Sequence, residues 1–363
     1  MNGSVLRILK SALSLSVASF LGIGASTGLA QHFDAAEYDS SARDALNYKR
    51  NSSFFAGNDL YFVDGMVTTL STAAATFDRT LFNQFRVGAD FQANSNLGVR
   101  AVLTMFNAYR KEEGKEEPRK VLTELRSELK PEVALTYLTQ SGLEVGVGLL
   151  LWYFRPFDRY SETDLIKTTE RISSAKLQTP YLFLVKRSTS FDGGFFYKIG
   201  SERSRRINIT TDQDANELRF VDQVNDPTTA SLFGRFKIWG GHLLAAFESI
   251  EAGEGGSRTD DGDTVSEDYM KFSGEGLVPL SGSLALNLAV IHRTLSYSDN
   301  RNVTFASMPL TVTHLRLIAG SSDNYAFGGV VYGSGKDAQS LPEFNASYKI
   351  SVVGGTLGIN LRF

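Results

Sequence analysis

The sequence predicts an all-β protein, a transmembrane antiparallel up-and-down β-barrel of about fourteen strands. Three observations lead to this prediction. Apolar and polar residues alternate with a period of two along many segments, which is typical of strands with two different faces. After the first thirty residues, no segment is apolar over the length that a membrane helix needs. Short turns alternate with long polar stretches, as in a barrel with short turns at one end and long loops at the other.

The composition removes several classes of protein. The chain of 363 residues has no cysteine, which excludes disulfides, thiolate metal sites and cysteine nucleophiles. Its four histidines are widely scattered, so we expect no metal and no cofactor. A formal net charge of −3 argues against a general nucleic-acid binder. The apolar share of 42% is that of a folded chain, and a barrel of this length forms a single domain.

Residues 1–30 have the order of a secretory signal peptide. Arg7 and Lys10 precede an apolar stretch, and small residues end at Ala30. The apolar stretch is diluted by serines, so we prefer a cleaved signal to a membrane anchor. We expect residues 31–57 to form a short periplasmic segment or a small plug, and residues 58–363 to form the barrel.

The end of the chain carries the most specific pattern. In residues 356–363, the odd positions Leu357, Ile359 and Leu361 are apolar, the even positions are polar or glycine, and the last residue is Phe363. The chain here resembles the bacterial outer-membrane β-barrel class, whose last strand alternates and ends in an aromatic residue. The resemblance implies an integral outer-membrane location, contact with outer-membrane lipid and lipopolysaccharide, and recognition of Phe363 by the barrel-assembly machinery.

Alternating patterns and turn residues divide the chain into fourteen predicted strands. Apolar parity flips between Val312 and Leu315 and between Val352 and Val353, where we expect β-bulges. A tight turn at Gly354-Gly355 is the alternative, so twelve or sixteen strands remain open. The predicted strands are 58–69, 76–92, 97–110, 131–140, 143–155, 177–188, 194–201, 229–239, 242–250, 267–280, 284–297, 303–318, 325–333 and 344–363.

The long polar stretches are predicted as extracellular loops. Within them, apolar residues spaced by three and four predict short helices over Pro118–Lys130 and Asp164–Ser173. These helices could cover the pore mouth or lie in solvent. The acidic segment Gly253–Asp263 lacks the spacing of a calcium loop, and we interpret it as a mobile loop.

The polar faces of the predicted strands supply candidate pore-lining residues, in which basic side chains outnumber acidic ones. Rings of charge select ions in a pore, so this excess predicts a weak preference for anions, unless the charges pair across strands. The candidates are Arg86, Asp90, Arg100, Glu144, Lys186, Lys198, Arg235, Lys237, Glu248, Lys271, Glu275, Arg293 and Arg362.

A porin-like channel for small solutes is the first functional hypothesis. The alternative is a transporter of a hydrophobic ligand, because the faces assigned to the interior also carry large apolar side chains. In strand number, this alternative resembles the long-chain fatty-acid transporters, although their Asn-Pro-Ala motif is absent. The apolar interior candidates are Leu150, Trp152, Phe154, Leu182, Leu184 and Phe196.

Two further classes are weaker. His292 and Ser296 share the lipid-facing side of one strand, but residues four apart on a strand are about 13 Å apart, too far for the hydrogen bond of a lipid acyl hydrolase. We therefore expect no enzyme. An adhesive or receptor role for the loops remains open.

Overall fold

The computed structural model describes most of the predicted barrel. The residues described are 52–69, 75–114, 121–162, 167–211, 218–226, 228–238, 241–251, 266–281, 283–298, 304–321, 324–336 and 346–362. The predicted signal peptide, Phe363 and the acidic segment Gly253–Asp263 lie outside them. The first strand begins at Ser53, so it includes residues 53–57, which the sequence had assigned to the N-terminal segment.

All regular structure in the described residues is β-strand. No helix in this part of the chain is long and apolar enough to cross a membrane. The segments are β1 Ser53–Thr69, β2 Ala75–Gln92, β3 Leu97–Gly114, β4 Val121–Leu138, β5 Leu143–Phe154, β6 Phe157–Glu162, β7 Lys167–Ile172, β8 Ala175–Arg187, β9 Phe191–Lys198, β10 Ser201–Thr211, β11 Leu218–Asp226, β12 Thr228–Ile238, β13 Gly241–Glu251, β14 Ser266–Ser281, β15 Leu284–Ser298, β16 Thr304–Gly320, β17 Tyr325–Lys336 and β18 Ala346–Arg362.

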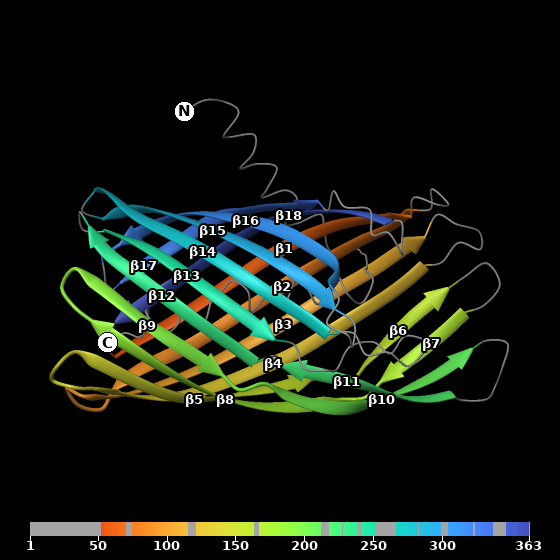
Figure 1. The fold of residues 1–363 in the computed structure, drawn as a ribbon, viewed down its shortest axis with the longest axis horizontal. Coiled ribbons are helices and arrows are strands. Elements are labelled where there is room, and N and C mark those ends of the chain that lie inside the picture. Colours follow the sequence, from red (N-terminus) through yellow and green to blue (C-terminus); the bar gives the residue numbers. More distant parts are fainter. Residues whose placement is uncertain are drawn as a thin grey trace, which may run out of the picture.

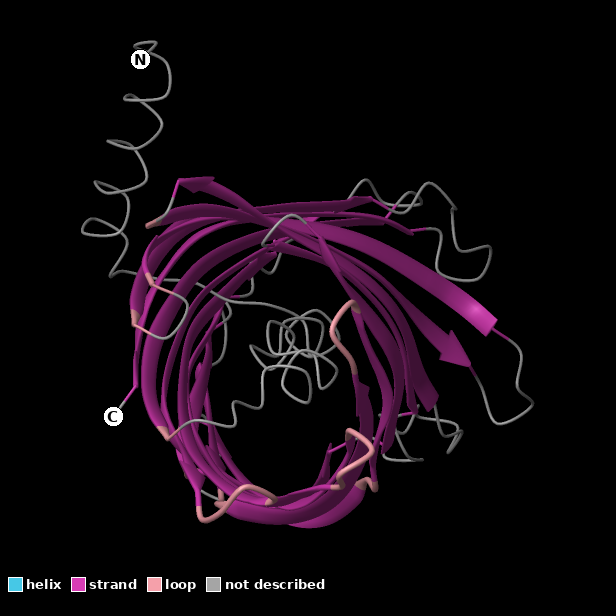
Figure 2. Cartoon of the chain, turned by 90° about the vertical axis from the view of Figure 1, so that its left-hand side faces the viewer, coloured by secondary structure: helices cyan, strands magenta, loops and turns pink. Residues whose placement is uncertain are grey.

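These segments form a closed antiparallel barrel of 14 strands, as the sequence predicts (Figure 2). Closure is made by β1 and β18, which pair without interruption from Ser53↔Arg362 to Thr69↔Ala346. A closed barrel has no free edge, so every strand has one face toward the interior and one toward the outside. Short turns cluster at one end of the barrel, near the C-terminus in Figure 1.

Four of the barrel strands are each built from two segments. β5 and β6 both pair with β4, so together they form one barrel strand. In the same way, β7 and β8 form a second strand, β9 and β10 a third, and β11 and β12 a fourth. The pairing to β4 slips by one residue between Glu128↔Phe154 and Glu124↔Arg159, around Arg155-Pro156. Proline lacks the N–H that a continuous ladder needs, so the break falls there. The outer segments extend the wall at the long-loop end (Figure 1).

The two predicted loop helices are therefore wrong. Val121–Leu138 is one long strand, and Lys167–Ile172 belongs to the hairpin of β6 and β7. Charged residues at every second position of β4 pair across strands, as in Arg159 with Glu124 and with Glu170. Such pairs stabilise the polar inner face of β4, whose outer face carries Leu125, Val133 and Leu135.

The predicted bulges are also absent, because the apolar parity changes while the strands stay regular. Val312 and Val352 are buried inside the barrel, whereas Leu315 and Val353 are exposed outside it. β18 passes through Gly354-Gly355 with unbroken pairing on both sides, so no turn forms there. The strand count of fourteen holds for this reason.

Cysteine pairs test the strand assignment of β4, since the natural chain has no cysteine. Thr123 lies directly opposite Tyr160 on β6. We expect Thr123→Cys/Tyr160→Cys to cross-link on oxidation, because directly opposite residues have the Cβ separation of a disulfide. Gel mobility under non-reducing conditions measures it. Thr123→Cys/Ser161→Cys places the two cysteines on opposite faces and should stay open; equal cross-linking of both pairs would contradict the register.

Candidate functional site: the apolar interior wall

An apolar stripe runs down the interior face of β8. Leu177, Tyr181, Phe183 and Val185 are buried on this face, which also carries the buried Thr179. The alternate residues from Gln178 to Lys186 point outward and are exposed. The stripe runs from Leu177 to Val185, or roughly 26 Å at ~3.3 Å per residue. A water-filled pore would place polar groups along this face.

Neighbouring strands widen this stripe into a wall. Phe196 of β9, Phe233 of β12 and Leu244 of β13 are buried beside it and form one packed cluster with Tyr181 and Phe183. The Tyr181 and Phe196 rings stack with centroids 5.3 Å apart. The Tyr181 phenol donates to Glu132 of β4, so its polar atom is satisfied while its ring stays in the wall.

Two glycines let the rings lie flat against the sheet. A Cβ at Gly146 would overlap the Phe183 ring, and a Cβ at Gly148 would overlap the Tyr181 ring. Both glycines are directly opposite these residues on β5. The rings therefore cover the backbone of β5, where a larger residue would force them toward the barrel axis.

Cations border the wall at its upper part, toward the long-loop end. Trp152 and Phe154 of β5 stack at 4.6 Å and pack on Leu177. Lys130 Nζ lies 3.4 Å from the centroid of the Trp152 ring, and the indole N–H donates to buried Glu128 at 2.7 Å. Lys130 and Glu128 come from the interior face of β4, which sequence reasoning missed because it placed residues 111–130 in a loop. The charges at every second residue from Glu124 to Glu132 were the available signal.

A second apolar cluster occupies the opposite wall. It spans β1, β2, β3, β16, β17 and β18 around mid-height, and Phe82 and Phe106 contact each other at 5.5 Å. Its other members are Tyr61, Val63, Ala108, Leu310, Val312, Val331, Ile350 and Val352. The interior thus carries apolar surface on both sides.

Charged side chains gather near the short turns. Asp192 of β9 is fully buried and is held by Arg235 at 2.6 Å and Lys237 at 2.7 Å, both from β12. Arg187 pairs with Glu144 beside them. These groups form a compact ion network at the short-turn end of the barrel, which the sequence predicts to be periplasmic. Within this network the charges are largely paired.

Most of the thirteen predicted pore-lining residues lie on the interior face, and many pair with one another. Asp90 with Arg100 and Glu248 with Lys271 form buried ion pairs. Glu275 accepts from Asn287 at 2.9 Å, and Arg293 is buried opposite Lys271. Arg86 lies over the Phe55 ring at 5.7 Å, and Lys198 pairs opposite Tyr181. Arg362 has interior parity but is exposed at the barrel end.

Three interior assignments are wrong. Lys186, Leu182 and Leu184 are exposed on the outer face of β8. The sequence assigned the two faces of this strand the wrong way round, because the interior face is the more aromatic one and the outer face contains Gln178, Pro180 and Lys186. Trp152, Phe154 and Phe196 are interior, as predicted.

The described residues contain no cluster that could hold a metal ion. His292 faces outward, and its Nδ1 lies 2.9 Å from the Thr311 hydroxyl of β16. His314 is buried inside, with Nδ1 3.4 Å from Arg316. Neither arrangement assembles a nucleophile with an oriented base.

Comparison with known proteins places this architecture. No protein-family model matches the chain, and no curated protein matches it in sequence. Among solved structures, the toluene transporter TodX of P. putida is 11% identical, with coverage of 91% of this chain and 94% of TodX, and a TM-score of 0.57. The Ralstonia pickettii toluene transporter TbuX is 9% identical, with 91% and 93% coverage and a TM-score of 0.57. A Pseudomonas aeruginosa FadL homologue is 7% identical, with 90% and 93% coverage and a TM-score of 0.54.

At these identities the likeness shows the fold alone. The chain has the fold of bacterial outer-membrane β-barrel proteins, and TodX and TbuX, two of the structures similar to it, are named as toluene transporters.

The flat packing of the rings gives the first test of the site. We expect Gly148→Val to destabilise the folded barrel by about 1–3 kcal/mol, the usual cost of overpacking, because the new side chain displaces the Tyr181 ring. Urea unfolding in lipid vesicles measures the change. Adding Tyr181→Ala removes the obstructing ring and should recover most of the loss. An equal loss in the single and double variants would mean that the ring does not cover the glycine.

The ion network gives the second test. We expect Asp192→Asn to cost about 1–3 kcal/mol of unfolding free energy, because it leaves Arg235 and Lys237 without their buried carboxylate. Asp158→Asn is the matched control, since Asp158 pairs with the largely exposed Arg171 and should change stability by less than about 1 kcal/mol. Similar values for both variants would contradict the network.

Proposed function

We propose that this protein is an outer-membrane channel for small hydrophobic molecules. The observation that carries the proposal is the interior stripe of Leu177, Tyr181, Phe183 and Val185, widened by Phe196 and Phe233. Apolar surface in a passage lowers the cost of taking an apolar molecule out of an apolar phase, because the molecule exchanges one apolar contact for another. Similar structures are named as toluene transporters, which agrees with this class of ligand.

The charge distribution argues against a simple anion-selective pore. Many of the basic residues that suggested anion preference are paired with interior carboxylates, as Arg235 and Lys237 are with Asp192 and Lys271 is with Glu248. Charges that are paired with a neighbour create a weaker electrostatic potential along the interior than rings of unpaired charge do, so they select ions less strongly. The porin-like reading is therefore our second candidate.

We also propose the cellular setting that the sequence indicates. The N-terminal segment directs export, the barrel inserts in the outer membrane in contact with lipid and lipopolysaccharide, and Phe363 serves as the assembly signal. Nothing in the proposal requires a cofactor or a covalent step. The mechanism is diffusion along the apolar wall past Tyr181 and Phe196.

Uptake by cells tests the function. In bacteria that lack their own hydrocarbon channel, expression of this protein should raise entry of radiolabelled toluene severalfold, with no comparable rise for a small sugar. Phe196→Gln should reduce toluene entry, because it places an amide in the apolar wall. The neighbouring Phe195→Gln is the control, since Phe195 belongs to the outer face.

Planar-bilayer recording distinguishes the proposed hydrophobic channel from the porin-like alternative. Large stepwise ion conductance together with unchanged toluene entry would support the porin-like channel and contradict our proposal.

A further inference from the structure

A charged stripe on the inner face of β4 separates the two apolar walls. Its charges alternate in sign along the strand, and its members are Glu124, Arg126, Glu128, Lys130 and Glu132. On one side the stripe borders the wall of Phe106, which is directly opposite Glu128. On the other side it borders Trp152 of β5, which is directly opposite Lys130. A molecule that touches both walls on this side of the barrel therefore also touches the stripe.

One carboxylate of the stripe differs from the other two in its exposure. Glu124 and Glu128 are buried, and each pairs with an arginine. Glu132 is partly exposed, and it accepts a hydrogen bond from the Tyr181 phenol. Because a carboxylate has about four lone-pair sites on its two oxygens, Glu132 can accept from a ligand as well as from Tyr181.

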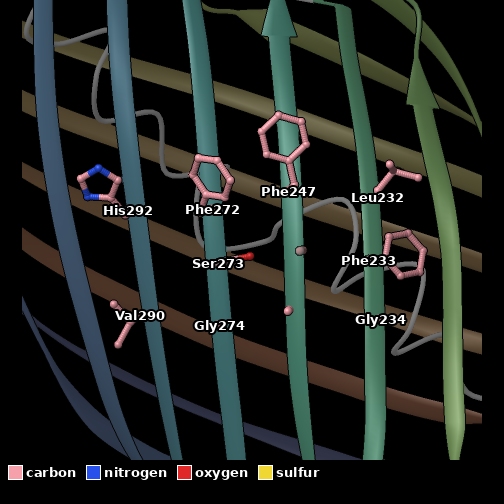
Figure 3. A pocket seen from close by; sticks show the side chains of 11 residues that line it. Leu232, Phe233, Gly234, Phe247, Phe272, Ser273, Gly274, Val290 and His292 are labelled. Carbon is pink, nitrogen blue, oxygen red and sulfur yellow. The ribbon is translucent and has the colours of Figure 1, made fainter.

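A second polar group in the interior offers a ligand less. Figure 3 shows the outer face of β13 and β14, where Phe247 and Phe272 lie. Their sequence neighbours Glu248 and Lys271 point inward and pair with each other, and Ser231 also donates to Glu248. Glu248 is 1% exposed and Lys271 is 4% exposed. These groups satisfy one another below the surface of the interior, so the accessible carboxylate of the stripe is the better site.

The alternating signs decide which polar group fits beside an apolar body at Glu132. An anion is repelled by Glu132 itself, and a cation is repelled by Lys130, which is two residues away, or about 6.6 Å at ~3.3 Å per residue. A hydrocarbon covers the partly exposed carboxylate without offering it a hydrogen bond, which costs free energy. A neutral hydroxyl avoids both repulsions and supplies the O–H donor that the carboxylate accepts.

We propose that the interior selects aromatic molecules that carry a hydroxyl group, with the O–H donating to Glu132. Leu150 is directly opposite Glu132, and the Tyr181 ring reaches the same carboxylate through its phenol, so apolar surface for the ligand ring lies beside the hydrogen-bond acceptor. The selection deepens the proposed hydrophobic channel and depends on it. It makes Glu132 a specificity-determining residue of the passage.

Toluene, benzyl alcohol, benzoate and benzylamine test the selection, because they share one carbon skeleton and differ in the polar group. Equilibrium dialysis of each radiolabelled compound against the full chain folded in detergent, corrected for protein-free detergent, gives the affinities. We expect benzyl alcohol to bind at least as tightly as toluene, although its hydroxyl favours water, and the two ions to bind more weakly.

Substitution of Glu132 tests the assigned residue. Glu132→Leu should weaken benzyl alcohol binding at least about tenfold, the effect of losing one hydrogen bond to a charged group, without weakening toluene binding. Glu170→Leu is the matched control, because it removes another inner-face carboxylate whose partner Arg159 keeps its pair with Glu124. It should leave the ratio of the two affinities unchanged.

Tyr181→Phe separates selection from a structural role. The variant keeps the ring and removes the phenol that shares Glu132 with the ligand, so benzyl alcohol should bind more tightly. A pair that only holds the strands together would give losses in both Glu132→Leu and Tyr181→Phe, and that result would overturn the proposal.

Three further results would overturn it. Toluene could bind more tightly than benzyl alcohol to the wild type, Glu132→Leu could leave the ratio of affinities unchanged, or one of the ions could bind most tightly. In each case a rise in toluene entry in the uptake assay would leave the proposed channel standing, whereas no rise would overturn the channel too. Heat-modifiable gel mobility confirms that each variant is folded.

Discussion

The structure depends on the pairing of every backbone group within a closed sheet. A strand in lipid has no water to satisfy its N–H and C=O groups, so only a sheet that closes on itself avoids unpaired edges. Here the register between β1 and β18 completes that closure over the full length of both strands. Closure then gives each strand an inner and an outer face, and the function follows from what each face carries.

The inner face of the barrel carries both apolar walls and paired charges. Apolar walls around Tyr181 and around Phe82 occupy the middle of the barrel, and paired charges such as Asp192 with Arg235 lie near its short-turn end. Glycines opposite the rings keep the aromatic side chains against the sheet instead of across the interior. An apolar molecule can contact such walls, while the buried ion pairs hold the strands in register.

Alternation in the sequence was sufficient to predict the barrel, because the outward positions are apolar over residues 284–290 of β15 and, apart from Gly355, over residues 353–361 of β18. The count of fourteen needed the pairing of β18 through Gly354-Gly355, since the sequence left twelve or sixteen strands open. Alternation could not show which face of β8 points inward, because both faces carry apolar residues. The curvature of the closed sheet decides which face is inside. The helices predicted over Pro118–Lys130 and Asp164–Ser173 failed because leucine spacing outweighed the charges of β4, whose period of two is a strand signal.

The most direct test of an apolar passage is a crystal structure of the protein soaked with bromobenzene. The anomalous signal of bromine locates the ligand without reference to its shape. Our account predicts a peak inside the barrel, against Tyr181, Phe183 and Phe196. Bromine found only on the outer surface, with the interior wall unoccupied at saturating ligand, would contradict it.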